Sequence, residues 1–284
     1  MVPEPSVLLG VLVTAWLYGR GVRALWQHAG RGRGIRRWQV VAFAAGLLAL
    51  VLALASPLDQ LAESLFAAHM VQHLLLILIA GPLLVLGMPL VPFLWAIPEA
   101  SRRGLGRWWR QAGWLRGVWR SLSLPAVAFV LHSLALWSWH APGLYEAALS
   151  SRPIHVAEHL SFLGTSLLFW WSLLHGGRST YGASVLFVFG MAIESTALGA
   201  LLTFARSAWY TSHVATAPGF GLSALEDQQL AGLIMWVPGG SIYLVSALAL
   251  FAAWLKEGES GTPHPAAHTP AGRSSVGFGP PEPR

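Results

Sequence analysis

The chain alternates between long apolar stretches and short polar segments. Seven of the stretches have roughly the 20 apolar residues that a helix needs to cross the hydrocarbon core of a bilayer. They are Val7–Trp26, Trp38–Ala55, Leu61–Leu86, Leu122–Trp139, Ile154–Leu174, Tyr181–Phe204 and Leu230–Leu255. This pattern predicts an all-α polytopic membrane protein, with a bundle of seven transmembrane helices forming one domain over residues 1–255. Pro82 is expected to kink or end the third helix, because proline interrupts the helical hydrogen bonds.

The distribution of basic residues predicts the orientation of these helices. Of the 18 Lys and Arg residues, 16 fall in the segments after the first, third, fifth and seventh apolar stretches or at their ends, and only Arg152 and Arg206 fall on the other side. An excess of Lys and Arg marks the cytoplasmic face. The N-terminus is therefore predicted to lie outside and the C-terminus in the cytoplasm. The net charge of +6 is explained by this asymmetry, so we do not predict binding to nucleic acid.

Two segments outside the apolar stretches predict an amphipathic surface helix and a disordered tail. Between residues 105 and 119, Leu and Trp recur at helical spacing among arginines, which predicts an amphipathic helix lying on the inner surface of the membrane. Residues 256–284 are rich in Pro, Gly and Ser and are predicted to form a disordered cytoplasmic tail.

The composition limits the chemistry of any metal site. Only 11% of the residues are charged, against about 25% in soluble domains, and the chain has no cysteine. The lack of cysteine excludes disulfides, thiolate metal sites and iron–sulfur clusters. It leaves imidazole, thioether and carboxylate groups as possible ligands.

Two pairs of histidines stand inside the apolar stretches. His69 and His73 lie in the third stretch, and His155 and His159 lie in the fifth, each pair at spacing i, i+4. On a helix this spacing puts both imidazoles on one face, so that one helix can offer two nitrogens to one metal ion. Polar side chains are expensive inside a membrane and are therefore candidates for function.

The predicted orientation brings further histidines to the same depth. His140 ends the fourth stretch at the outer surface, and His132 lies about 12 Å deeper on that helix. We therefore predict a metal site in the outer leaflet whose ligands come from His69, His73, His132, His140, His155 and His159.

The spacing of these residues leaves three interpretations open. Copper, zinc, iron and nickel all suit imidazole ligands. The segment His155-Val-Ala-Glu158-His159 fits the H-x-x-E-H pattern of a zinc metallopeptidase with Glu158 as general base. A b-type haem protein is the other alternative, because facing histidines on adjacent helices can serve as axial ligands.

Several motifs resemble the CtaG-type assembly factors of caa-type cytochrome c oxidases. They are H-M-x-x-H at 69–73, W-H-x-P-x-L-Y at 139–145, H-x-x-E-H at 155–159, and Asp227 to Trp236 at the start of the seventh stretch. The resemblance covers roughly residues 38–255, and it implies a seven-span protein that helps to mature the copper-containing haem–copper centre of the oxidase. The histidines that match the family are His69, His73, His140, His155 and His159, whereas His132 is added on depth alone.

Together, the pattern and the resemblance predict a copper-handling assembly factor in the bacterial plasma membrane, not an enzyme. Its expected partners are a cytochrome c oxidase subunit, a copper donor on the outer side, and the lipid bilayer.

Overall fold

The computed structural model describes residues 5–175 and 181–260, and this part of the chain is helical with no strand. The elements are α1 (Pro5–Ala29), α2 (Arg37–Leu54), α3 (Pro57–Ser64), α4 (Phe66–Leu74), η1 (Leu75–Ala80), α5 (Gly81–Leu86), α6 (Leu90–Ala96), α7 (Glu99–Gln111), α8 (Gly113–Leu122), α9 (Pro125–Trp139), α10 (Pro142–Ser150), α11 (Arg152–Leu174), α12 (Tyr181–Thr203), η3 (Ala217–Phe220), α13 (Ala224–Ile234), η4 (Met235–Gly239) and α14 (Gly240–Ser260).

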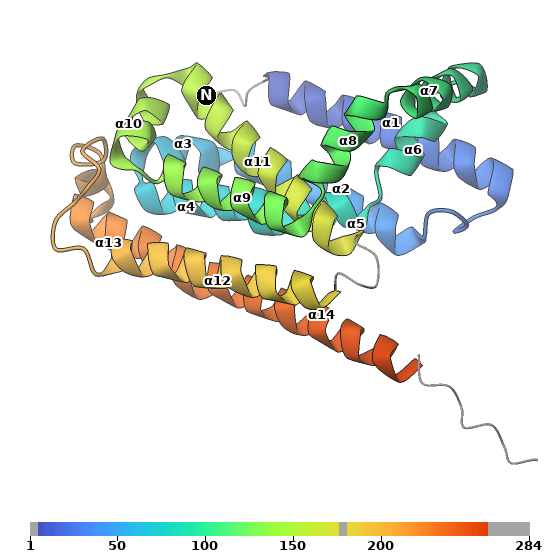
Figure 1. Ribbon diagram of the computed structural model, residues 1–284. Coiled ribbons are helices and arrows are strands. Elements are labelled where there is room, and N and C mark those ends of the chain that lie inside the picture. Colours follow the sequence, from blue (N-terminus) through green and yellow to red (C-terminus); the bar gives the residue numbers. More distant parts are fainter. Residues whose placement is uncertain (1–4, 176–180, 261–284) are drawn as a thin grey trace, which may run out of the picture.

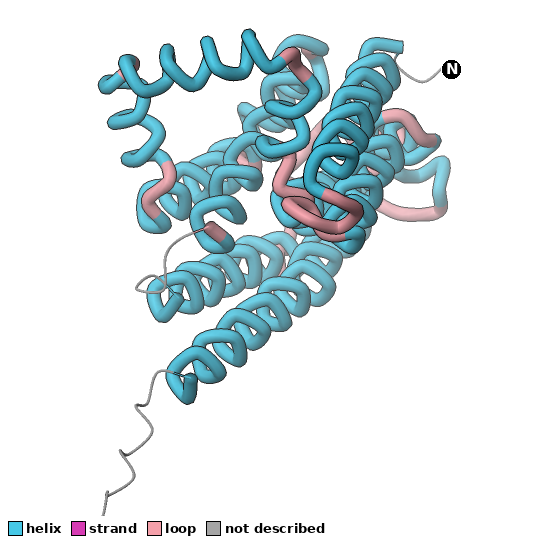
Figure 2. The backbone as a smooth tube through the Cα atoms, turned by 90° about the vertical axis from the view of Figure 1, so that its right-hand side faces the viewer, coloured by secondary structure: helices cyan, strands magenta, loops and turns pink. Residues whose placement is uncertain are grey.

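The long helices lie side by side in a bundle (Figure 1). The helix formed by α13, η4 and α14 packs along α12, α9 packs on α11, and the helix formed by α4, η1 and α5 lies between α2 and α11. The short helices α3 and α10 and the start of α13 gather at one end of the bundle. Figure 2 shows α7 and α8 standing away from the bundle, and neither has a buried residue.

Five helical segments in the described part of the chain are long and apolar enough to cross a membrane. They are Pro5–Ala29, Arg37–Leu54, Phe66–Leu86, Gly182–Thr203 and Ala224–Leu255, and the bent pair Gly113–Leu122 and Pro125–Trp139 makes a sixth if it is counted as one span. The length and apolar composition of these helices indicate a multi-pass membrane protein. A seventh span through α11 and the orientation of the termini stay predictions. The first half of α11 is polar, and α9 has only 15 residues.

The third predicted stretch is divided at Leu65, which is extended and separates α3 from α4. The carboxylate of Asp227 fills this break: it accepts hydrogen bonds from the backbone N–H groups of Phe66 (2.7 Å) and Ala67 (3.0 Å). The first N–H groups of a helix have no partner inside the helix, and a negative charge is favourable at that end. Asp227 comes from the first turn of α13, so this contact joins two segments far apart in sequence.

A close approach of two backbones fixes α13 against α12. A Cβ atom at Gly199 would lie only 2.8 Å from the carbonyl oxygen of Gly232, so no larger residue fits there. Small residues at helix crossings allow membrane helices to pack tightly. This crossing holds α13, and with it Asp227, in place.

Pro82 was expected to kink or end the third helix, and in the structure it does not end it. The chain instead widens into the π-helical segment η1 before Pro82 and continues through α5. Because proline has no N–H group, carbonyls one turn earlier need other partners. The carbonyl of Ile77 accepts hydrogen bonds from Ser166 (2.8 Å) and Trp170 (3.1 Å), which ties η1 to α11.

Two predicted surface features differ in their boundaries. The amphipathic helix expected over 105–119 begins earlier, at Glu99, and consists of two helices. Ala112 interrupts the helix between α7 and α8. The helix α14 continues to Ser260, into the predicted tail, and the remainder of that tail lies outside the described residues.

The orientation is tested by labelling single cysteines, since the chain has none of its own. Ser150 and Ser101 are both exposed. Ser150 is the last residue of α10, and Ser101 lies in the first turn of α7. We expect Ser150→Cys to react with a membrane-impermeant thiol reagent in intact cells and Ser101→Cys to react only after lysis. The opposite pattern would overturn the outward placement of the histidines.

The contact of Asp227 with α4 is tested by thermal unfolding of the purified protein. Asp227→Ala leaves two buried N–H groups unpaired, and each is expected to cost about 1–3 kcal/mol of unfolding free energy. Glu226→Ala is the matched control, because this exposed neighbour only caps its own helix through Ser223. Equal, small losses in both variants would show that the contact with α4 contributes little.

Candidate metal centre

The helix α4 presents His69 and His73 on one face. Both side chains are buried, with exposed fractions of 0% and 3%, and their ring centroids lie 4.4 Å apart. Gln72, on a neighbouring face, donates hydrogen bonds to the carbonyl of Ala53 (2.8 Å) and to Asp59 (2.7 Å). These bonds fix the rotation of α4 about its axis, so the two imidazoles face α11.

The helix α11 supplies the other half of the centre. His155, Glu158 and His159 stand at i, i+3 and i+4, so they share the face turned toward α4. Glu158 is fully buried, and its Oε2 and Oε1 atoms each lie 3.6 Å from an imidazole, those of His69 and His73 respectively. The bonds from Ser166 and Trp170 to Ile77 hold the two helices together two to three turns further on.

Four residues converge on one point. Ligand atoms of His69, His73, Glu158 and His159 all lie within 4.8 Å of one another. In a tetrahedral site with bonds of about 2.0–2.2 Å, the ligand atoms are roughly 3.3–3.6 Å apart. The two contacts between histidine and Glu158 match this spacing. Three nitrogens and a carboxylate could therefore hold a single ion here.

The hydrogen bonding of these four residues supports the same conclusion. Both ring nitrogens of His69 and His73, both carboxylate oxygens of Glu158, and Nε2 of His159 are buried without a hydrogen-bond partner. Leaving such groups unpaired costs about 1–3 kcal/mol each, and native proteins rarely do so. A bound cation would satisfy all four side chains at once.

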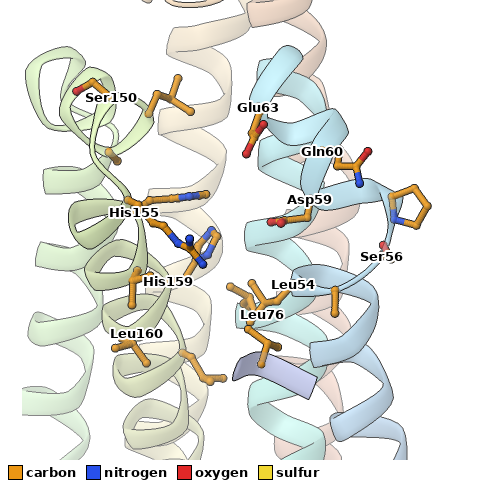
Figure 3. Close-up of a pocket in the computed structure, with 18 of the residues that line it drawn as sticks. Leu54, Ser56, Asp59, Gln60, Glu63, Leu76, Ser150, His155, His159 and Leu160 are labelled. Atoms are coloured by element: carbon orange, nitrogen blue, oxygen red, sulfur yellow. The ribbon is translucent and has the colours of Figure 1, made fainter. Parts of the chain in front are cut away.

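His155 joins this group from the side of an open pocket. Its ring lies 4.3 Å from that of His159 and 5.4 Å from that of His69. Figure 3 shows His155 and His159 pointing from α11 into a pocket of about 1170 Å³, with Asp59 and Glu63 of α3 on the facing side. Acidic side chains near a concave site raise the local concentration of cations, so this pocket offers a path to the buried group.

An aromatic cluster closes the centre on the side of α10. Phe66, Tyr145 and Tyr210 contact one another with ring centroids 4.4–4.9 Å apart, and Tyr145 lies 5.2 Å from the ring of His69. The hydroxyl of Tyr145 is 2.7 Å from Nε2 of His213. His213 is thus a buried partner of Tyr145. The cluster keeps water away from the metal-binding face.

The segment after α12 is held over this cluster by Glu146 of α10. Its carboxylate accepts hydrogen bonds from the backbone N–H groups of Thr211 (2.5 Å) and Ser212 (3.1 Å) and from both of their hydroxyls. Partial burial raises the pKa of Glu146, but the hydrogen bonds from Ser212 and Thr211 outweigh it and keep the pKa below its ordinary value. The carboxylate therefore stays charged at neutral pH and keeps the cluster closed.

Besides His155, two other predicted ligands, His140 and His132, lie outside the four-residue group. The ring of His140 is 6.1 Å from that of His73, and its two nitrogens contact the carbonyl of Leu136 and the sulfur of Met70. His132 has partners for both nitrogens, Thr165 at 2.9 Å and Tyr243 at 3.5 Å. Their side chains therefore contact partners outside the four-residue group, and their role as ligands stays a prediction.

Two residues of the centre had other roles in the sequence interpretation. Glu158 was considered only as the base of a peptidase, although it stands in the buried ligand group. Asp227 was singled out only as the first residue of a family motif, but it caps α4, the helix that carries His69 and His73. The spacing of Glu158 beside His159 was the signal that could have included it, since both occupy one helical face.

The ligand group is tested with zinc, which has no redox chemistry and accepts imidazole and carboxylate. His159→Asn should weaken zinc binding by at least about 100-fold, because it removes a direct ligand and the effect should exceed that of losing an outer partner. His132→Asn should change the affinity by less than about tenfold. The measurement is competition with a zinc chelator, with thermal unfolding confirming that both variants fold. Equal losses would place His132 among the ligands.

The comparisons with known proteins agree with the motifs. Residues 16–257 match the family described as cytochrome c oxidase caa3 assembly factor, so the match also includes most of α1. Relatives in Mycobacterium bovis and Mycobacterium tuberculosis, both named as uncharacterized proteins, are each 25% identical over 277 residues, which is 90% of this chain and 41% of the relative. A third, in Mycobacterium leprae, is 24% identical over 77% of this chain and 34% of its own length.

The chain thus spans about two fifths of the length of these relatives. No solved structure matches it. Because the family match covers nearly all the described residues and includes both helices of the histidine and glutamate group, the chain belongs to the family of cytochrome c oxidase caa3 assembly factors.

Proposed function

We propose that this protein binds copper at His69, His73, Glu158 and His159 and helps to insert it into a haem–copper cytochrome c oxidase. The proposal places it in the bacterial plasma membrane, with the centre in the outer leaflet. Membership of the assembly-factor family supports the oxidase as its partner. The observation that carries the copper proposal is the buried convergence of four potential ligands, seven of whose nitrogen and oxygen atoms have no hydrogen-bond partner among the described residues.

The ligand set favours copper over other metals. Without cysteine, the donors are imidazole nitrogens and a carboxylate, and imidazole suits copper, zinc, iron and nickel. Charge also matters, because an ion buried in an apolar bundle is costly unless its charge is balanced. The single negative charge of Glu158 balances Cu(I), whereas Cu(II) would leave a net positive charge in the core. We therefore assign Cu(I) as the cargo.

The pocket and the histidine pairs provide a route for the ion. Copper from a donor on the outer side reaches the pocket bordered by Asp59 and Glu63, where His155 and His159 are the first imidazoles it meets. Exchange of one imidazole for its neighbour then moves the ion to the buried group. Release to an oxidase subunit at similar depth uses the same kind of exchange, so the protein acts as a carrier and not as an enzyme.

The geometry favours this function over the two alternatives. A peptidase would keep Glu158 free beside a metal-bound water, but its two oxygens face His69 and His73 within the closed group. A b-type haem would need histidines on opposite faces of a flat macrocycle, but these donor atoms lie within 4.8 Å of one another. A small ion suits the arrangement better in both respects.

The proposal is tested on the oxidase of a strain that carries His73→Ala. The variant protein should insert normally, because removing one imidazole leaves the apolar length of its helix unchanged. The oxidase should contain its haems but lack copper at the haem–copper centre, and its oxygen reduction should fall in parallel. The measurement is the copper-to-haem ratio of the purified oxidase beside its activity.

His175→Ala is the matched control, since this histidine lies at the far end of α11 and stacks on Trp171. It should leave the ratio and the activity unchanged. A normal copper-to-haem ratio in the His73→Ala strain would show that this histidine does not serve copper delivery. Recovery of the ratio with added external copper would strengthen the proposal, because a weakened carrier responds to concentration.

A further inference from the structure

A second pair of metal-ligating side chains lies beside the four-residue group. Met70 follows His69 on α4, and His140 caps the C-terminus of α9. Both side chains are buried, with exposed fractions of 1% and 5%. The sulfur of Met70 lies 3.3 Å from Nε2 of His140.

The hydrogen bonding of His140 fixes which nitrogen carries the proton. Nδ1 lies 2.7 Å from the carbonyl oxygen of Leu136, and a carbonyl can only accept, so Nδ1 must donate. A neutral imidazole has one N–H group, and Nε2 therefore presents its lone pair. The backbone of His140 is also held, because its carbonyl accepts a hydrogen bond from the hydroxyl of Tyr210 at 2.8 Å.

The contact between His140 and Met70 is therefore between two electron-pair donors. A thioether has no hydrogen to donate, so neither atom satisfies the other in a neutral pair. A protonated His140 would bury a cation held only by the carbonyl of Leu136 and by a thioether, which is a weak acceptor, whereas a metal cation bonds to both lone pairs. A soft cation between nitrogen and sulfur resolves this conflict.

The space and the donors suit one Cu(I) ion. Met70, His140 and His73 line a cavity of about 20 Å³ together with Met235, the first residue of η4. A cavity of that size holds about one water-sized sphere. For bonds of about 2.0 Å to nitrogen and 2.3 Å to sulfur, atoms 3.3 Å apart subtend about 100° at the ion, which is near the tetrahedral angle.

We propose that Met70 and His140, with Met235 as a further thioether, form a second, softer Cu(I) site next to the four-residue group. This inference rests on the proposed copper function and adds to it a second site, to which copper moves from the four-residue group. His73 belongs to the four-residue group and also lines the second cavity. It is thus the ligand that both sites can share.

Transfer between the sites is a ligand exchange. The bonds from copper to His69, Glu158 and His159 break, the bonds to the Met70 sulfur and the His140 nitrogen form, and His73 remains bound throughout. Copper stays in the +1 state, so the step needs no electron or proton. Thioether donors favour Cu(I) over harder ions, which makes the second site selective for the reduced ion.

The test uses the full-length protein in lipid nanodiscs under reducing, oxygen-free conditions. Cu(I) is titrated against a chromogenic chelator, and X-ray absorption reports any copper–sulfur bond. The wild-type protein should bind about two equivalents with a copper–sulfur contribution, because the chain has a harder and a softer site. Met70→Leu, which conserves volume, should bind about one equivalent and lose most of the sulfur contribution.

The controls separate this inference from the proposed copper function. Met191→Leu removes a buried sulfur that contacts Ser133 outside this cavity, and it should behave as the wild type. Zinc binding should be the same in Met70→Leu and the wild type, which shows that the variant is folded and its first site intact. His159→Asn should keep the sulfur contribution while losing tight zinc binding.

Each contrary result has a definite meaning. Wild-type protein with one equivalent of copper and no sulfur bond would overturn the second site while the proposed function stands. Unchanged stoichiometry and spectrum in Met70→Leu would do the same. Wild-type protein that binds no Cu(I) at all would overturn both the second site and the proposed function.

Discussion

The placement of the candidate metal centre depends on one charged contact, that of Asp227 with the start of α4. The two hydrogen bonds from Phe66 and Ala67 let a helix begin in the interior of the bundle, where water cannot satisfy its first N–H groups. His69 follows in the first turn. Because α13 supplies the carboxylate, the position of the histidines along α4 is set by a helix that is more than 150 residues away in sequence.

In the candidate metal centre, the helices are held together by hydrogen bonds, whereas the side chains between them have polar atoms without a hydrogen-bond partner. Gln72, Ser166 and Trp170 all make buried hydrogen bonds that fix α4, η1 and α11 relative to one another. Among the described residues, the ring nitrogens of His69 and His73 and the carboxylate of Glu158 between them make none. A preorganised metal site needs such supporting contacts. Their favourable free energy offsets the cost of holding polar side chains close together without hydrogen-bond partners before an ion binds.

Both π-helical segments lie next to the proposed sites. The segment η1 directly follows the helix that carries His73, and η4 begins at Met235. A proline stands in or just after each, and its missing N–H group releases the helix from regular hydrogen bonding. Such segments are frequent at functional sites. Here they let two spans widen beside a small cavity, so that side chains from α4, α9 and η4 can meet there.

The amino-acid sequence by itself determined the helical membrane architecture and the pairing of histidines on shared helical faces. Both follow from local rules, because the apolar length sets a span and the spacing i, i+4 sets a face. Only the tertiary structure decided that Glu158 stands beside His69 and His73, that His132 turns toward Thr165, and that Met70 meets His140. These outcomes depend on how helices rotate and slide against one another, which distant contacts such as that of Asp227 fix and which no local pattern encodes.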